Sequence, residues 1–336
     1  MEKKVVIQGK DLSIGYRTGK KEKIVHQHLN FQLHSGELTC LLGANGAGKS
    51  TLLRTLSASQ PSLSGELRML DKPVSEYTEK ERSRTIGVVL TDKTFTGGLS
   101  VYELVALGRQ PHTGFFGRLQ KEDKRIIEEA MEQVGIAHKA RNYTAELSDG
   151  ERQKVMIAKA LVQECPLILL DEPTAFLDVV SRIEIMHLLH RLAIEQNKAI
   201  LLSTHDIEQA LVLSDKLWLL TKGEGLQCGV TEDLILSHRM DSLFPHKDIR
   251  FDYYHGVYYP TVAGQRKVCV SCEDKTLLHW TMNALNRHGY QCVNTPDAEI
   301  PCLKVRSSKE LEWTEKGITS SHTSFESLLS LIISRD

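Results

Sequence analysis

The chain contains 336 residues, of which 41% are hydrophobic and 25% are charged, an ordinary composition for a globular protein. Its length predicts one large domain and a smaller one. The formal net charge of −1 leaves no basic footprint, so we expect no nucleic-acid partner. No apolar run approaches the roughly 18 residues that would cross a bilayer, and the start lacks the apolar core of a signal peptide. Seven cysteines form no disulfide framework, so the composition favours a cytoplasmic protein.

The first part of the chain predicts three strands. Residues 5–14 alternate between apolar and polar side chains, residues 24–33 repeat the pattern, and residues 37–42 form a continuous apolar run. Tyr16 follows the first strand, just before a polar turn expected at 17–23. It could stack on a nucleotide base or stand half-exposed at a strand end, and the residue chemistry alone leaves both interpretations open.

The segment 43–51 matches G-x-x-x-x-G-K-[ST], between a predicted strand and a predicted helix. Backbone N–H groups of such a loop surround a phosphate chain, and the helix N-terminus adds positive potential. Lys49 would reach the β- and γ-phosphates, and the Ser50 hydroxyl would hold Mg²⁺. The residues predicted to bind nucleotide are Gly43, Ala44, Asn45, Gly46, Ala47, Gly48, Lys49, Ser50 and Thr51.

Beyond this loop the pattern changes from strands to helices and back. Residues 66–70 and 85–90 read as strands, and residues 95–150 as a mostly helical insertion. The segment Leu147-Ser148-Asp149-Gly150-Glu151 then opens a helix that runs to about residue 163.

An apolar strand at 166–170 ends in Asp171 and Glu172. On its own this pattern fits an acidic turn, but with a phosphate loop upstream it predicts a ligand crevice at the carboxyl end of a parallel strand. Asp171 would hold Mg²⁺ through water, and Glu172 would act as general base. His205 follows the next strand, at 198–203; a lone histidine is usually structural, but this one is placed to contact a γ-phosphate or water. Residues 217–220 and 225–230 predict a final pair of strands.

Together these motifs resemble the ATP-binding subunit of ABC transporters, over about residues 4–240. The family's Walker A loop is similar to GANGAGKST, its Walker B strand to LILLDE, and its C-loop, usually LSGGQ, to LSDGE at 147–151. Asp178 falls at the D-loop, His205 at the switch histidine, and Tyr16 at the adenine-stacking aromatic. The resemblance implies an α/β fold: a P-loop ATPase core with an antiparallel β subdomain and a helical subdomain at about 95–150.

The resemblance also implies a mechanism and partners. Two copies of the chain would bind two ATP molecules head to tail, with Lys49 and Ser50 of one copy facing Ser148 and Gly150 of the other. Hydrolysis with Glu172 and His205 would then release the dimer. Separate transmembrane permease subunits, and indirectly a periplasmic or lipoprotein substrate-binding protein, would complete a transporter. The chain would lie on the cytoplasmic face of the inner membrane.

The sequence departs from the family pattern at two places. In the C-loop, Asp149 replaces the first glycine and Glu151 replaces the glutamine, which sets acidic groups near a triphosphate. The family also has a Mg²⁺-binding glutamine just after the strand at 85–90, and this chain has none there. We expect Thr91, or Asp92 beside it, to supply the missing oxygen ligand.

The segment 101–118 and the run 174–178 look most like importers of iron–siderophore complexes, haem or vitamin B12. The alternatives are the ATPase of an exporter or, because ABC ATPases also act in DNA repair and translation, a soluble enzyme of that kind. The single phosphate loop and the net charge near zero argue against a soluble ABC ATPase of DNA repair or translation.

We place the domain boundary at residue 244, so that residues 245–336 form a small accessory α/β domain of unknown role. Strands are expected at 266–271, 290–294 and 302–306, and helices at 276–288 and 325–333. Cys269, Cys272, Cys292 and Cys302 suggest a zinc site. Strand residues three apart point to opposite faces, so we interpret them as buried strand cysteines.

Overall fold

The structure, a computed structural model, describes residues 3–19, 21–90, 98–114, 117–260, 264, 266–293, 295 and 299–333. The chain divides into two compact units. The first comprises Met1–Pro245 with Phe251–Val257, and the second comprises His246–Arg250 with Tyr258–Asp336. Among the described helices, none is both long and apolar enough to cross a membrane.

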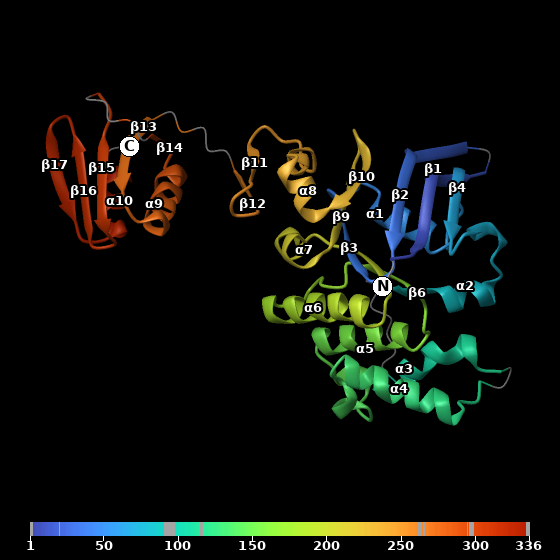
Figure 1. The fold of residues 1–336 in the computed structure, drawn as a ribbon. Helices are drawn as coiled ribbons and strands as arrows, with labels where there is room; N and C mark the ends of the chain where they lie inside the picture. Colours follow the sequence, from blue (N-terminus) through green and yellow to red (C-terminus); the bar gives the residue numbers. More distant parts are fainter. Residues whose placement is uncertain are drawn as a thin grey trace. The chain divides into compact units, whose positions relative to one another are not determined.

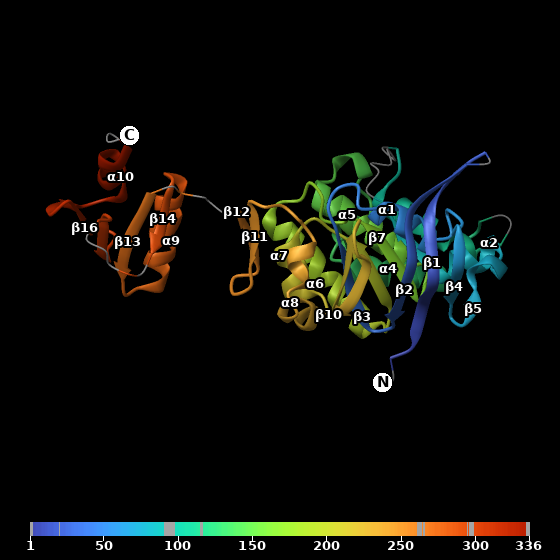
Figure 2. The same ribbon diagram turned by 90° about the horizontal axis from the view of Figure 1, so that it is seen from above.

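An antiparallel sheet opens the first unit, with the strand order β2-β1-β4-β5. Its strands are β1 (Val5–Thr18), β2 (Lys21–His34), β4 (Ser64–Met69) and β5 (Lys72–Pro73). The first two strands form a long hairpin, and β1, β2 and β4 lie side by side in both views (Figures 1 and 2). The turn expected at 17–23 is shorter than predicted, because β1 continues to Thr18 and β2 begins at Lys21. Arg17 pairs in register with Glu22, and their side chains form an ion pair at 2.8 Å. Cross-strand pairs of opposite charge stabilise a sheet, so these charged residues can belong to strands.

The second sheet of this unit has the order β10-β9-β3-β8-β7-β6 and is parallel except for β10. Its strands are β3 (Glu37–Leu42), β6 (Ile86–Val89), β7 (Leu167–Asp171), β8 (Ala199–Ser203), β9 (Lys216–Thr221) and β10 (Gly225–Val230). All four central strands are almost completely buried, as expected of strands that are covered on both faces. Because these four strands are parallel, their carboxyl ends lie at one edge of the sheet. The phosphate loop, the two acids and His205 follow β3, β7 and β8 at that edge.

Helices surround this sheet. They are α1 (Lys49–Leu56), α2 (Glu79–Thr85), α5 (Asp149–Leu161), α6 (Val179–Glu195), α7 (Ile207–Leu213) and α8 (Thr231–Leu236). A helical part contains α3 (Val101–Ala106) and α4 (Lys121–Gln133), with short 3-10 turns at Leu107–His112, Ala137–Lys139 and Thr144–Glu146. The helices α3, α4 and α5 pack together (Figure 1). A further 3-10 turn lies at Arg239–Ser242. The sequence prediction missed α7 and α8, because each is shorter than two full turns and its apolar residues show no clear helical period.

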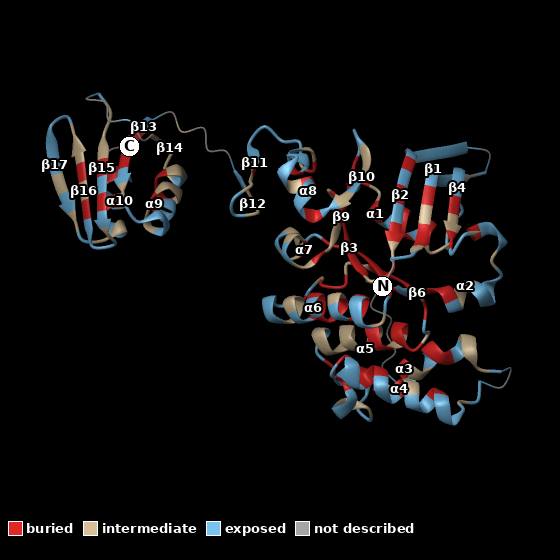
Figure 3. Cartoon of the chain, viewed as in Figure 1, coloured by how far each residue is buried: buried red, intermediate tan, exposed pale blue. Residues whose placement is uncertain are grey.

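The core of the first unit lies between its two sheets. Phe31 of β2 packs against Trp218 of β9, with ring centroids 4.8 Å apart. Leu12 and Leu33 of the antiparallel sheet and Leu201 of the parallel sheet belong to the same buried cluster. Figure 3 shows that the buried residues gather along the strands, while the outer faces of the helices are exposed. This shared core fixes the antiparallel sheet beside the phosphate loop.

The second unit has its own five-stranded sheet, ordered β14-β13-β15-β16-β17. Its strands are β13 (Arg266–Cys272), β14 (Tyr290–Val293), β15 (Cys302–Ser307), β16 (Glu310–Glu315) and β17 (Ile318–His322), and its helices are α9 (Lys275–Arg287) and α10 (Phe325–Ile333). A hairpin of β11 (Ile249–Asp252) and β12 (Val257–Pro260) precedes it in sequence. The sequence prediction missed β16 and β17, because only Leu311 and Trp313 of these two polar strands are buried. Both residues join the core that α9 and α10 cover.

Candidate nucleotide site

The segment 43–51 forms a loop between β3 and α1, as its motif predicts. Gly48 has a φ of 106°, a conformation that residues with a Cβ rarely adopt. A Cβ at Gly43 would lie 2.6 Å from the Leu220 carbonyl oxygen, so β9 leaves no room for a side chain there. The glycines therefore serve both the backbone conformation and the close packing of the loop on the sheet.

Lys49, the first residue of α1, folds back into the loop. Its side chain is buried, and its Nζ donates a hydrogen bond of 2.8 Å to the Gly43 carbonyl. Burial lowers the pKa of Lys49, while the nearby Glu172 and Asp171 carboxylates oppose that shift. The ammonium group is thus held inside the loop and close to two acids.

Glu172, His205 and Lys49 come together although they lie far apart in sequence. His205 Nε2 is 2.7 Å from Glu172 Oε1 and 3.3 Å from Lys49 Nζ. A carboxylate only accepts hydrogen bonds, so the His205 Nε2 position carries the proton that it donates to Glu172. The structure therefore brings all three of the predicted catalytic residues into one cluster.

Ser203, the last residue of β8, positions both acids, and the sequence reasoning missed it. Its hydroxyl donates to Asp171 Oδ1 at 2.6 Å and accepts from the Glu172 backbone N–H at 3.0 Å. Glu172 itself has a φ of 49°, in the left-handed region that is uncommon for a residue other than glycine. A polar residue that ends an otherwise apolar strand beside the acidic strand is the signal that could have revealed Ser203.

A cavity of about 600 Å³ opens above the phosphate loop. Its walls are formed by residues 44–51, by Glu172 and His205, and by Tyr16 with residues 23–25 of β2. Tyr16 lies in β1, its hydroxyl is 2.7 Å from Thr51 Oγ1, and it lines the cavity. The aromatic ring thus stands where a base could lie next to a phosphate chain held by the loop.

Ser50 and Asp171 line an adjoining cavity of about 460 Å³. A hydroxyl and a carboxylate are oxygen ligands, and Mg²⁺ is usually held by one or two such groups together with phosphate oxygens and water. The two residues therefore fit a Mg²⁺ that accompanies a nucleotide. Thr91 and Asp92, expected to complete this set, lie outside the described residues.

The segment 148–151 starts α5 and contributes no residue to the described walls of the phosphate-loop cavity. Ser148 caps the helix: its hydroxyl accepts from the Glu151 N–H, and the Glu151 carboxylate accepts from the Ser148 N–H. A 2.6 Å ion pair with Lys139 and these hydrogen bonds lower the pKa of Glu151 to about 2. Asp149 Oδ1 lies 3.4 Å from an Arg152 nitrogen. Both acids that depart from the family pattern thus have basic partners within the same subunit.

Asp178 is the N-cap of α6. Its carboxylate accepts from the Ser181 N–H at 2.9 Å and from the Ser181 hydroxyl at 3.0 Å. The backbone hydrogen bond from Ser181 is the main reason that the pKa of Asp178 lies below its usual value. Gly150 lies beside this cap, because a Cβ there would be 3.1 Å from Ser181 Oγ. The predicted C-loop and D-loop residues are therefore neighbours in the structure.

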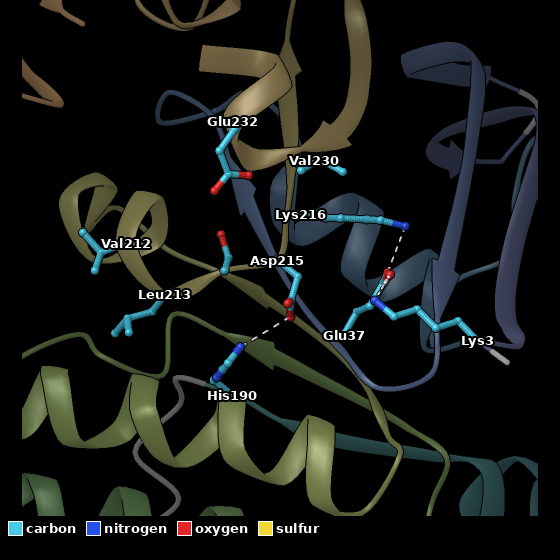
Figure 4. A pocket seen from close by; sticks show the side chains of 10 residues that line it. Lys3, Glu37, His190, Val212, Leu213, Asp215, Lys216, Val230 and Glu232 are labelled. Carbon is cyan, nitrogen blue, oxygen red and sulfur yellow. Dashed lines mark hydrogen bonds and ion pairs between the residues drawn. The ribbon is translucent and has the colours of Figure 1, made fainter. Parts of the chain in front are cut away.

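A second charged cavity, of about 400 Å³, lies at the opposite end of the parallel strands (Figure 4). Glu37, the first residue of β3, is almost fully buried there, and Lys3 and Lys216 both point at its carboxylate, at 2.8 and 2.9 Å. His190 Nε2 is 3.7 Å from Asp215 Oδ2. We name the Lys3–Glu37–Lys216 group the amino-end cluster.

The four cysteines of the second unit divide between the two faces of its sheet. Cys269 lies opposite Cys302 in register on neighbouring strands, whereas Cys272 and Cys292 pack against the hydrophobic core. Within the described part of the chain, no group of three or more His, Cys, Asp or Glu side chains could hold a metal ion. All four lie in strands, as we interpreted them, but only Cys269 is buried, and Cys272, Cys292 and Cys302 are half-buried.

Comparison with known families adds to this geometry. A family profile described as ABC transporter matches residues 26–175, and one described as iron ABC transporter C-terminal domain matches residues 265–332. The chain is 37% identical to the iron(3+)-hydroxamate import ATP-binding protein FhuC of Bacillus subtilis, over 69% of this chain and 85% of that protein. It is 35% identical to the ferric enterobactin transport ATP-binding protein FepC of Escherichia coli, over 71% of this chain and 86% of that protein.

Solved structures give the same result. A metal-chelate type ABC transporter in an inward-facing conformation matches with a TM-score of 0.62 and 28% identity, over 76% of this chain and 96% of that chain. A dimeric ATP-binding cassette in a post-hydrolysis state with ADP and Pi matches with a TM-score of 0.58 and 26% identity, over 67% of this chain and 98% of that chain. The α/β fold and the resemblance inferred from the motifs are confirmed: the chain belongs to the family of ATP-binding subunits of ABC transporters and is an ATPase of that family.

Proposed function

We propose that this chain powers an importer of iron–siderophore complexes, or of a related chelate such as haem or cobalamin, through a separate permease. The cluster of Lys49, His205 and Glu172 beside the phosphate loop is the observation that supports ATP hydrolysis. The match of residues 265–332 to the iron transporter C-terminal domain supports the substrate class. Relatives named for the import of ferric siderophores point the same way.

In the proposed binding step, the loop surrounds the triphosphate with backbone N–H groups, and Tyr16 stacks on the adenine. Lys49 exchanges its hydrogen bond to the Gly43 carbonyl for contacts with the β- and γ-phosphates. Ser50 and Asp171 would hold Mg²⁺, which would neutralise part of the phosphate charge.

In the proposed hydrolytic step, Glu172 accepts a proton from the attacking water as general base. His205 now donates to this carboxylate, and bound ATP would offer the γ-phosphate as a competing acceptor. If His205 turns to that phosphate, it frees a Glu172 oxygen for water. Ser203 holds the Glu172 backbone in place during this exchange.

The site is completed in our proposal by a second copy of the chain, whose Ser148, Asp149, Gly150 and Glu151 face the γ-phosphate and whose Asp178 lies beside them. The N-terminus of α5 would supply positive potential there. Because Asp149 and Glu151 are paired with Arg152 and Lys139, their charges oppose this potential less than free carboxylates would. The assembly would lie at the cytoplasmic face of the membrane and receive substrate from a binding protein.

The test is a pull-down from detergent-solubilised membranes with a tagged Glu172→Gln variant and ATP, compared with a Lys49→Ala variant as the control. We expect mass spectrometry to recover a polytopic permease with Glu172→Gln and less of it with Lys49→Ala. ATPase activity of the recovered complex, reconstituted in lipid with the binding protein, should rise when that protein carries a ferric siderophore. Recovery of soluble partners alone would contradict a transport role, and a permease that exports its substrate would contradict import.

A further inference from the structure

His26 lies in β2, outside the motif segment, yet it contacts the phosphate loop directly. Its side chain is buried, with 6% of the residue exposed, and its Nε2 is 2.6 Å from the Ala47 carbonyl oxygen. A carbonyl only accepts hydrogen bonds, so Nε2 carries the proton. The ring also touches the next residue of the loop, because a Cβ at Gly48 would lie 3.2 Å from His26 Cδ2 and Nε2.

Through the peptide bond between Ala47 and Gly48, the contact with His26 also sets the direction of the Gly48 N–H. In a trans peptide the carbonyl and the following N–H point in opposite directions. A carbonyl anchored on His26 therefore directs the Gly48 N–H away from the His26 ring, which is not part of the cavity wall described above. With a φ of 106° at Gly48, the backbone has unusual freedom here, and the reversed peptide would aim a carbonyl oxygen at the ligand.

We propose that His26 is a positioning residue for ATP: it fixes the Ala47–Gly48 peptide so that the Gly48 N–H is available to phosphate. Other inward residues of β2, such as Leu29 and Leu33, are apolar and fill the core. A leucine at position 26 could also be buried, but it would leave the Ala47 carbonyl without this donor. The inference rests on the proposed function of the loop as the ATP site.

The experiment measures binding of ATP and of inorganic tripolyphosphate to the full chain by isothermal titration calorimetry. His26→Leu removes the donor and keeps an apolar side chain, whereas His26→Gln places an amide N–H at a similar reach. We expect His26→Leu to weaken both ligands by about tenfold, as for the loss of one buried hydrogen bond. His26→Gln should restore most of the affinity. The KM for ATP should rise with little change in kcat, since the contact is made to the loop and not to the reacting water.

His28→Asn is the matched control, because it removes an exposed imidazole from the same strand. Should His26→Leu fail to fold, His26→Asn replaces it, since its shorter amide cannot reach Ala47 while Gln can. Equal affinities in wild type, His26→Leu and His26→Gln, with Lys49→Ala still impaired, would overturn the inference and leave the ATP site intact. If wild type binds neither ligand, or Lys49→Ala binds both normally, the proposed function itself fails.

Discussion

The two ends of the same parallel sheet carry similar side chains in opposite arrangements. At the carboxyl end, His205 Nε2 donates to Glu172 and lies 3.3 Å from the Lys49 ammonium, another donor, and Glu172 is one-third exposed beside a cavity. At the amino end, Glu37 is almost fully buried and has a lysine at each oxygen. The amino-end cluster holds its carboxylate between two ammonium groups, whereas the carboxyl-end cluster keeps its groups close together beside an open cavity.

This difference separates charges that stabilise a fold from charges that act on a ligand. Burial alone would raise the pKa of Glu37, but the lysine ammonium groups outweigh burial and hold that pKa below its usual value. Burial lowers the pKa of Lys49, and the acids nearby only partly oppose it. For Lys49, the attraction of the nearby carboxylates does not fully offset the cost of burying its charge. Such a charge is stabilised most when a triphosphate binds beside it.

The largest expected effect comes from Glu172→Gln, which removes the proposed general base and keeps the shape of the side chain. We expect the ATPase kcat to fall by about 10² to 10⁴, the usual contribution of general base catalysis. ATP affinity should change little, because the phosphate loop and Lys49 are intact. The measurement is phosphate release at saturating ATP together with calorimetric binding. Activity within a factor of two of wild type would place the base elsewhere.

Glu37→Gln tests whether the amino-end cluster stabilises the fold. It leaves Lys3 and Lys216 facing a neutral group, so we expect the free energy of unfolding to fall by about 2 kcal/mol. This is less than the 3 to 5 kcal/mol typical of a fully buried pair, because Lys3 is half-exposed. The kcat of the folded protein should be unchanged. A loss of kcat with unchanged stability would show that the two ends do not differ as we describe.

The same variant predicts a pH dependence. Because the native pKa of Glu37 lies below the usual 4.5, its stabilisation is present above about pH 4.5 and is lost as the pH falls through the lower native value. Urea unfolding of wild type and Glu37→Gln should therefore differ most near neutral pH and converge in acid. A difference that grows as the pH falls would contradict this assignment.

The smallest effect is expected for Glu151→Gln, which keeps the N-cap arrangement of α5 and removes the charge that pairs with Lys139. Both side chains are about one-quarter exposed, so the loss of stability should stay below about 1 kcal/mol. Thermal unfolding measures it, with Glu184→Gln as a control for the more exposed pair with Lys154. A loss as large as that of Glu37→Gln would contradict the ranking.

Much of this architecture could be predicted because local patterns and the fold agree. The apolar runs at β3, β7 and β8 have the period and length of buried parallel strands, and the residues that follow them must meet at one edge. The motif at 43–51 carries its own glycines and lysine. The sequence therefore predicts that Lys49, Glu172 and His205 lie close together, as they do in the structure.

The remaining parts depend on contacts that no local pattern encodes. Ser203 and His26 act through hydrogen bonds to residues 31 and 21 positions away, and each looks like an ordinary strand residue in sequence. The hairpin of β16 and β17 has few apolar positions: β16 alternates only around Leu311 and Trp313, and no residue of β17 is buried. The outer residues of the turn expected at 17–23 belong to strands, because cross-strand pairing outweighed local polarity there.

The left-handed backbone of Glu172 has a consequence for how this protein can evolve. Glycine adopts that conformation without strain, so at this position it would relieve a cost of order 1 kcal/mol. Laboratory evolution for heat resistance alone would thus be drawn to glycine here, and would discard the carboxylate that we propose as the general base. Under the proposed function, position 172 is a place where stability and turnover select for different residues.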